Sequence, residues 1–192
     1  MIRSGDTIEN PVTGERLVFT ATSAETGGEY VRFECFVEPS GFVAAAHLHP
    51  LQEELFEIVE GSITFKVNGQ ELPTRPGDRV LVPARTRHQS WNAGDATARF
   101  MCEVRPALQF EQLIETMFSL AREGKTNAHG MPNPLRLAVI AHAHFDTVRL
   151  PFPPEWMQRA GLAMGAPLGR LLGYGPTYAP EPGPLSGEVV AA

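Results

Sequence analysis

Two stretches of the chain decide its fold, because each carries histidine, glutamate or glycine residues at characteristic intervals. Residues 41–61 read GFVAAAHLHPLQEELFEIVEG, and residues 77–92 read GDRVLVPARTRHQSWN. In the first stretch one residue separates His47 from His49, and four more precede Glu54. Imidazole and carboxylate groups are the usual protein ligands of transition metals. The spacing therefore makes these side chains candidates for a metal site.

The positions of these side chains suit a site built from β-strands. Residues two apart in a strand project to the same face, so His47 and His49 can direct two imidazoles to one point. Glu54 opens the next apolar run, and we expect its carboxylate to point inward. His88, on another strand, would supply a third imidazole. Three neutral nitrogens and one carboxylate would give a divalent cation a site of net charge about +1, with one or two open coordination positions.

The first 107 residues contain many short runs that are typical of β-strands. The runs are rich in Val, Phe, Ile and Thr, and Gly, Pro or Asn residues separate them. We expect strands at residues 16–22, 30–37, 54–60, 62–67, 79–82 and 98–104. Between two of them, Asn68-Gly69 predicts a type I′ hairpin. This pattern favours an antiparallel sandwich or barrel over a βαβ sheet.

The two motifs resemble the signature motifs of the cupin superfamily, and the resemblance covers about residues 30–107. The family pattern is Gly-x5-His-x-His-x4-Glu-x6-Gly followed by Gly-x5-Pro-x-Gly-x2-His-x3-Asn. Every position of the first motif is present, and the second departs once, with Arg85 in place of glycine. Glycine there usually serves a turn with positive φ. We therefore expect either a turn of different shape or an arginine at the mouth of the barrel.

The resemblance implies a mainly β fold, a cupin-type jelly-roll barrel of six to eight strands at residues 1–107. It also implies one divalent transition metal per chain, and Fe, Mn, Ni, Cu or Zn would suit the ligand set. The implied ligands are His47, His49, Glu54 and His88. Glu53 is the rival for the carboxylate ligand, but the six-residue interval to Gly61 selects Glu54. The alternative is that these are polar loop residues that bind no metal.

Residues 108–175 are predicted to be a helical extension. Apolar residues at spacings of three and four predict an amphipathic helix from Phe110 to about Gly124. A second helix is expected after Asn133, with a first-turn proline, and it runs through residue 143 towards residue 148. A third is expected from residues 153–155 to about residue 174. Residues 176–192 are rich in Pro, Gly and small side chains, and we expect a flexible tail.

The third predicted helix carries glycines at intervals of four. They are Gly161, Gly165, Gly169 and Gly173. A ridge of small residues lets two elements approach closely, and a helix so rich in glycine forms only when it docks on something. We expect it to pack on the outer face of the barrel or on the second subunit of a dimer, with interfacial membrane contact less favoured. Pro167 should kink or break it.

Length, charge and cysteine content exclude several classes of protein. A chain of 192 residues is one domain, or one domain with an appendage. Its net charge of −6 counts against nucleic acid and against an acidic membrane surface as partners. Cys35 and Cys102 show no metal or redox spacing, which indicates reduced core residues in a cytoplasmic protein. No run of apolar residues follows residues 1–6, so we expect no secretory signal.

A second His-x-His pair lies in the helical part, at His142 and His144. Residues two apart on a helix point about 200° apart and cannot share one metal ion. We interpret both as partly buried helix residues. Asp146 lies four residues after His142 and could pair with it. His129 lies in a loop that contains Gly and Asn, and its pattern predicts no role.

The leading functional hypothesis is a metal-dependent enzyme that acts on a small organic molecule. Because cupins that resemble this chain often have that activity, a quercetinase-like dioxygenase ranks first, with Glu54 doubling as a base. A non-redox isomerase, lyase or cyclase ranks next. From other classes, the alternatives are a metal-dependent small-molecule binding module without turnover and a storage or structural protein. We expect a cytoplasmic homodimer.

Overall fold

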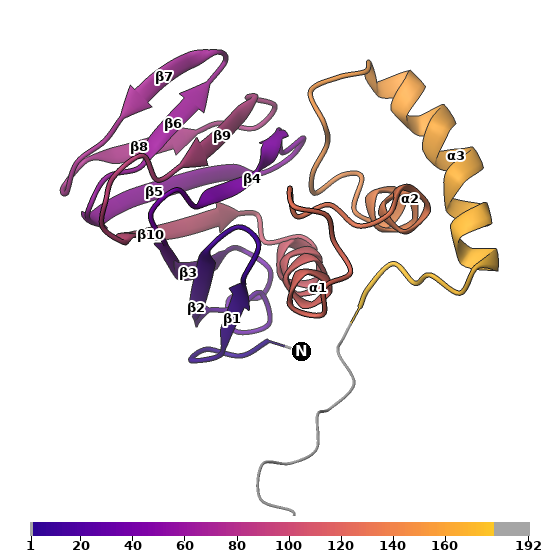
Figure 1. Cartoon of the computed structure of the whole chain (residues 1–192), viewed down its shortest axis with the longest axis horizontal. Helices are drawn as coiled ribbons and strands as arrows, with labels where there is room; N and C mark the ends of the chain where they lie inside the picture. The colour runs from indigo at the N-terminus through magenta and orange to yellow at the C-terminus, as the bar shows by residue number, and fades with distance from the viewer. Residues whose placement is uncertain (1, 179–192) are drawn as a thin grey trace, which may run out of the picture.

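The computed structural model describes residues 2–178, which form two antiparallel β-sheets followed by three helices (Figure 1). The strands are β1 (Thr7–Asn10), β2 (Glu15–Ala21), β3 (Val31–Val37), β4 (Phe42–His47), β5 (Glu53–Glu60), β6 (Thr64–Val67), β7 (Gln70–Pro73), β8 (Arg79–Val82), β9 (His88–Trp91) and β10 (Ala98–Arg105). The helices are α1 (Phe110–Arg122), α2 (Pro134–Ala143) and α3 (Glu155–Leu171). None of these helices is long and apolar enough to span a membrane.

The sheets have the arrangement of a jelly roll. One contains six strands in the order β1-β2-β3-β10-β5-β8, and the other contains four in the order β4-β9-β6-β7. The pairings within both sheets are antiparallel. The predicted mainly β jelly-roll fold with C-terminal helices is confirmed, although the two sheets do not close into one continuous barrel.

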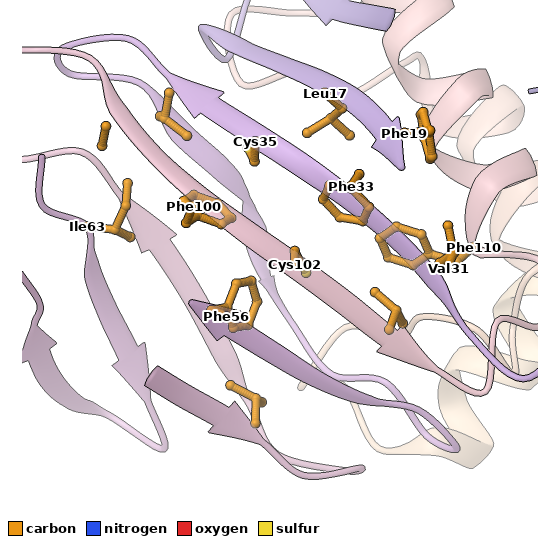
Figure 2. Close-up of a cluster of buried hydrophobic side chains, with 14 of the residues drawn as sticks. Leu17, Phe19, Val31, Phe33, Cys35, Phe56, Ile63, Phe100, Cys102 and Phe110 are labelled. Carbon is orange, nitrogen blue, oxygen red and sulfur yellow. The ribbon is translucent and has the colours of Figure 1, made fainter. Parts of the chain in front are cut away.

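Alternation of side chains along the central strands builds the core. In β3 and β10 every second residue is buried, which places Phe33, Cys35, Phe100 and Cys102 on the inner face (Figure 2). Phe110, the first residue of α1, stacks on Phe33 with ring centroids 5.7 Å apart. The first helix is therefore anchored to the sheet core, and its apolar face covers one end of the sandwich.

The Asn68-Gly69 hairpin is confirmed. Val67 pairs with Gln70, and both turn residues have positive φ, 50° and 89°, as a type I′ turn requires. The strands that the sequence pattern missed include β1 and β7. The four residues of β7 are all exposed, so they carry no alternation of apolar and polar residues to recognise.

The second helix is shorter than expected. The Asn133 side chain caps it by accepting from the Arg136 N–H at 3.0 Å, as the sequence indicates. It ends at Ala143, and His144 is its C-cap. The chain then turns back towards the sheets, so residues 145–149 reach the end of β4 instead of extending the helix.

The third helix continues through Pro167 and is not broken there. Pro167 and Ala163 are both exposed, so the carbonyl that loses its helical partner lies on the solvent side. The glycine ridge faces α2: a β-carbon on Gly169 would lie 2.5 Å from the Leu135 carbonyl oxygen, and one on Gly165 would lie 3.0 Å from Ala138 Cβ. This part of the ridge therefore docks within the chain, whereas we expected the barrel or a second subunit.

The segment expected to be a flexible tail begins within the described part of the chain. Tyr178 packs beside α1, and its backbone N–H donates to the Thr116 hydroxyl at 3.1 Å. Residues 179–192 lie outside the described residues.

Candidate metal centre

The structure brings together the four side chains that the sequence motifs single out. His47 ends β4, His49 follows it by two residues, Glu54 is the second residue of β5, and His88 begins β9. Their candidate ligand atoms all lie within 4.8 Å of one another. Three of the side chains are buried, and His47 is half-buried. The cluster thus lies where both sheets meet at one end of the jelly roll.

Alternation along β5 decides which glutamate faces this cluster. Glu54 is 5% exposed, and its inward-facing neighbours on the same side of the strand, Phe56 and Ile58, are also buried. Glu53 points to the opposite face and is exposed. Because successive side chains of a strand point to opposite faces, only one of the two carboxylates can join the histidines.

Backbone carbonyl groups fix the orientation of all three imidazole rings. Each ring places its Nδ1 atom against a carbonyl oxygen, and the pairs are His47 with Ala45 (2.8 Å), His49 with Thr147 (2.6 Å) and His88 with Thr86 (3.0 Å). Because a carbonyl oxygen only accepts, Nδ1 carries the proton in each pair. The neutral rings then present an Nε2 lone pair to the cluster, as rings that bind metals in proteins usually do.

The cluster contains buried lone pairs without a hydrogen-bond partner. Glu54 Oε2 lies 2.7 Å from His88 Nε2 and 3.4 Å from His49 Nε2, but these contacts lack the angles of normal hydrogen bonds. Both Glu54 Oε2 and His49 Nε2 are buried and unpartnered within the described residues. Leaving such atoms unsatisfied is costly, and a cation placed between them would remove that cost. The donor set therefore fits one divalent transition metal ion.

Burial and mutual interaction shift the ionisation of these groups. Burial, with the neighbouring His49 and His88, lowers the pKa of His47 to about 3. Burial alone would raise the pKa of Glu54, but the surrounding imidazoles outweigh it and hold the value at about 2. Burial opposes protonation of His88, yet its contact with Glu54 raises its pKa. A neutral His47 beside an ionised Glu54 is the protonation state that binds a cation.

The cluster opens into a cavity of about 500 Å³ between the sheets and the helices. Its wall is mostly apolar and includes Phe33, Phe56 and Phe100 from the sheets and Met117 and Phe118 from α1. Part of α2 and the first half of α3 complete the wall. A cavity of this size and character accommodates an organic molecule with a large apolar surface.

The segment between α2 and α3 contacts the four-residue cluster. Leu48, between His47 and His49, exchanges two backbone hydrogen bonds of 2.9 Å with Arg149. Thr147, on the same segment, accepts the Nδ1 proton of His49 across 98 residues of sequence. No local pattern marks Thr147 as a partner of the site, and sequence reasoning missed it.

Arg85 adopts the backbone conformation that the family motif usually assigns to a glycine. Its φ is +65°, in the left-handed region, and its backbone N–H donates to the His49 carbonyl at 2.7 Å. The side chain is exposed and does not line the cavity. The backbone conformation is therefore retained in spite of the missing glycine, and the arginine does not line the mouth.

The second histidine pair lies apart from the cluster. His142 is exposed, whereas His144 is only 2% exposed and places Nε2 3.3 Å from the Pro176 carbonyl. Burial lowers the pKa of His144. Asp146 forms ion pairs with Arg149 at 3.4 Å and Arg159 at 4.0 Å. The pair is thus split between solvent and core, and Asp146 is engaged by arginines.

Two antiparallel sheets in a jelly roll, with three histidines and one glutamate converging at one end, define a class of small β proteins that can hold a metal ion. Residues 33–104 match the family model described as "Cupin domain". A protein of Hypocrea virens described as "probable oxidoreductase virH" is 30% identical over an alignment of 153 residues, and the match covers 71% of this chain and 68% of that protein. The chain belongs to the cupin superfamily.

Other similar proteins match shorter parts. Quercetin 2,3-dioxygenase of Bacillus subtilis is 33% identical over 78 residues, 40% of this chain and 23% of the dioxygenase. A predicted oxalate decarboxylase from Thermotoga maritima has a similar solved structure, with a TM-score of 0.50 and 18% identity, over 55% of this chain and 98% of that one. The chain spans only 39% of the length of the Streptomyces cyaneus polyketide synthase protein CurC, which it also matches.

Proposed function

We propose that the protein is a metal-dependent oxidoreductase of the dioxygenase type, acting on a small organic molecule with an enolic or phenolic oxygen. The observation that carries the proposal is the position of the four-ligand cluster in the wall of a mostly apolar cavity. Such a cavity binds a flat, apolar substrate, and the cluster provides one polar end at which an oxygen atom can be held. The similarity to quercetin 2,3-dioxygenase and to a probable oxidoreductase supports this reaction class.

In this proposal His47, His49 and His88 hold the metal through Nε2, and Glu54 holds it through its carboxylate. A bound redox-active cation would polarise the enolic or phenolic oxygen and exchange electrons with dioxygen. The carbonyl groups at Nδ1 keep the rings in the metal-binding orientation. Glu54 Oε2 would accept the proton that the substrate hydroxyl loses, and the apolar wall excludes water around it.

The experiment that tests this function begins with elemental analysis of protein purified without added metal. We expect about one Fe, Cu, Ni or Mn per chain, and dioxygen uptake with at least one member of a panel of enolic and phenolic compounds. Zinc without uptake would contradict the dioxygenase and favour a non-redox isomerase, lyase, cyclase or binding module.

Two variants and a matched control test the ligand set. His49→Ala and His88→Ala should each lose the bound metal, because both remove a buried Nε2 donor. Glu53→Ala, one residue from Glu54 but on the exposed face, should keep it. Stoichiometric metal in both histidine variants would show that the ligand assignment is wrong.

We also propose that the protein is a cytoplasmic homodimer. Support for the cytoplasm comes from Cys35 and Cys102, which are both buried and unpaired. Support for the dimer comes from large apolar side chains exposed on α3 and its C-cap, namely Trp156 (70%), Met164 (69%), Leu168 (54%), Leu171 (83%) and the C-cap residue Leu172 (61%). At 100° per residue these lie within an arc of about 160° on one face of the helix.

The apolar face of α3 is close to the size that a stable dimer needs. Together with Phe152, which is 77% exposed just before the helix, it presents on the order of 600 Å² of side-chain surface, against about 800 Å² per partner in a standard interface. We expect the double change Leu168→Glu and Leu171→Glu to convert a dimer to a monomer in sedimentation equilibrium. A wild-type protein that stays monomeric at high concentration would contradict the proposal.

A further inference from the structure

Glu15 is a buried carboxyl group that the metal centre does not use. It is the first residue of β2, is 7% exposed, and shares its side of the strand with the buried Leu17 and Phe19. Its side chain therefore points between the sheets, and Glu15 lines the same cavity as the metal cluster. A carboxyl group in such a position is normally paired with a cation or with several hydrogen-bond donors.

Glu15 has no such cation beside it, and the hydrogen-bond donor next to its carboxyl group is the Thr13 side chain. Among residues 2–178 no lysine, arginine or histidine forms an ion pair with it, and the ionisable side chain that faces it is Cys35. Thr13 is 4% exposed, and its hydroxyl lies close enough to Glu15 to oppose the rise of that pKa. The contact does not have the geometry of a normal hydrogen bond, and no other described residue pairs with the hydroxyl. Asn10, beside them, is already engaged, because its Oδ1 accepts from the backbone N–H groups of Val12 and Thr13.

The Thr13 and Glu15 side chains lie at the end of the cavity opposite the metal cluster. The Thr13 carbonyl accepts from the N–H of Phe42, which begins β4, and His47 ends that strand. Phe42 pairs with Trp91 and His47 pairs with His88, so the two ends of β4 lie three residues apart along β9, roughly 10 Å. The intervening wall includes Cys35 and Phe100, which Figure 2 shows on the inner face of the large sheet. The cavity thus has two polar ends and an apolar middle.

The loop before α2 covers this second end. A β-carbon on Gly130 would lie 3.4 Å from Thr13 Cγ2, so the loop backbone packs directly on the threonine. His129 and Met131, on either side of Gly130, also line the cavity. The polar pair is thereby shielded from solvent, and groups on a bound molecule are the partners that can satisfy it.

We propose that Glu15 and Thr13 form a second subsite that binds a hydroxyl group at the far end of an elongated aromatic ligand. The inference rests on the proposed function, in which the near end of the ligand carries the oxygen held at the metal centre. The substrate class is a flat, polycyclic phenol with hydroxyl groups at both ends and an apolar body. Molecules that lack the far hydroxyl group leave the Thr13 hydroxyl unsatisfied and make no hydrogen bond to Glu15, and they should bind about tenfold more weakly.

The test compares two flavonols in anaerobic titration calorimetry with the metal-loaded protein, so that binding is measured without turnover. Quercetin and 3-hydroxyflavone share the 3-hydroxy-4-keto group, but 3-hydroxyflavone lacks the other hydroxyl groups. We expect Glu15→Leu and Thr13→Val to weaken quercetin binding by about tenfold and to leave 3-hydroxyflavone within twofold of wild type. Glu15→Gln keeps the shape of the side chain and can still form a hydrogen bond, so its affinity for quercetin should lie between those of wild type and Glu15→Leu. Glu29→Gln, on an exposed turn, is the matched control and should change neither affinity.

The outcomes separate the subsite from the function on which it rests. If His49→Ala abolishes binding of both flavonols while Glu15→Leu and Thr13→Val affect neither, the metal site stands and the subsite is wrong. Equal losses for both flavonols in Glu15→Leu and Glu15→Gln would also overturn the subsite. Binding of neither flavonol by the metal-loaded wild type would overturn the phenolic substrate class in both proposals.

Discussion

Replacing Glu15 with glutamine should change how the stability of the protein depends on pH. Burial raises the pKa of Glu15 from its ordinary 4.5 to about 7, against a smaller opposing effect of the Thr13 side chain. Between these values the folded state keeps a proton that the unfolded state releases, so the free energy of unfolding falls as pH rises. The contribution is fully present below pH 4.5 and is lost as pH rises through about 7. The difference between a pKa of 4.5 and one of about 7 corresponds to roughly 3 kcal/mol of stability, at about 1.36 kcal/mol per pH unit.

Urea denaturation of wild type and Glu15→Gln at intervals from pH 4.5 to 8.5 measures this contribution. Contributions from the metal centre cancel in the difference between the two proteins, because the variant leaves that site intact. We expect the difference to grow steadily from its value at pH 4.5, by about 3 kcal/mol in favour of glutamine, and to level off by pH 8. Cys35, which faces Glu15, does not interfere, since burial raises its pKa well above 9.

The exposed Glu29 provides the control for this measurement. Glu29→Gln makes the same chemical change on the surface and should give a difference from wild type that stays within about 0.5 kcal/mol across the range. A Glu15→Gln difference that does not vary with pH would mean that the Glu15 carboxylate is hydrated or paired in the folded protein. The second subsite would then lose its physical basis.

Three further changes test the turn, the helix contact and the metal centre. Arg85→Gly should raise the free energy of unfolding by about 1 kcal/mol in chemical denaturation, because glycine adopts the left-handed conformation without strain; a lower stability would refute this. Gly169→Ala should lower the free energy of unfolding by about 2 kcal/mol, because its methyl group would overlap the Leu135 carbonyl. Gly161→Ala has open space around the added methyl group and should raise the free energy of unfolding by up to about 0.8 kcal/mol. Chelation of the bound metal should lower the Tm of the wild type but not of His88→Ala, measured by scanning calorimetry; equal Tm shifts would contradict the assignment.

The metal cluster is the part of the site that sequence reasoning predicts best, because its geometry is local. The period of two along a strand predicts that His47 and His49 share a face, and the two histidines do lie together although β4 ends at His47. The same rule separates Glu54 from Glu53. His88 is distant in sequence, but the strand pairing His47↔His88 brings it opposite. The spacing of the motif residues therefore follows from the alternation along each strand and from the way that the strands pair.

Residues that contact the site from other parts of the fold cannot be predicted from the spacing of the motif. Thr147 meets His49 only because the chain turns back after α2, and the pattern of residues 134–148 predicts a longer helix instead. Glu15 is a different case. The predicted strand began one residue later, at position 16, since a glutamate at the start of a strand resembles an exposed residue. Its parity with Leu17 and Phe19 is the signal that places it inside.

The glycine ridge of α3 shows why periodicity predicts a contact without predicting the partner. A row of glycines makes one helix face smooth, and a smooth face fits any surface that can approach closely. Here the surface is α2, where the Leu135 carbonyl and Val139 leave no room for a side chain at Gly169. Figure 1 shows α3 lying against α2 on one side only. Gly165 and Gly169 contact α2, and large apolar residues on the other side of α3, among them Leu171, are exposed. The helix therefore has two faces with different roles. The glycine face packs on α2 and so supports the segment that positions His49. The leucine face is the surface that we propose contacts a second copy of the chain.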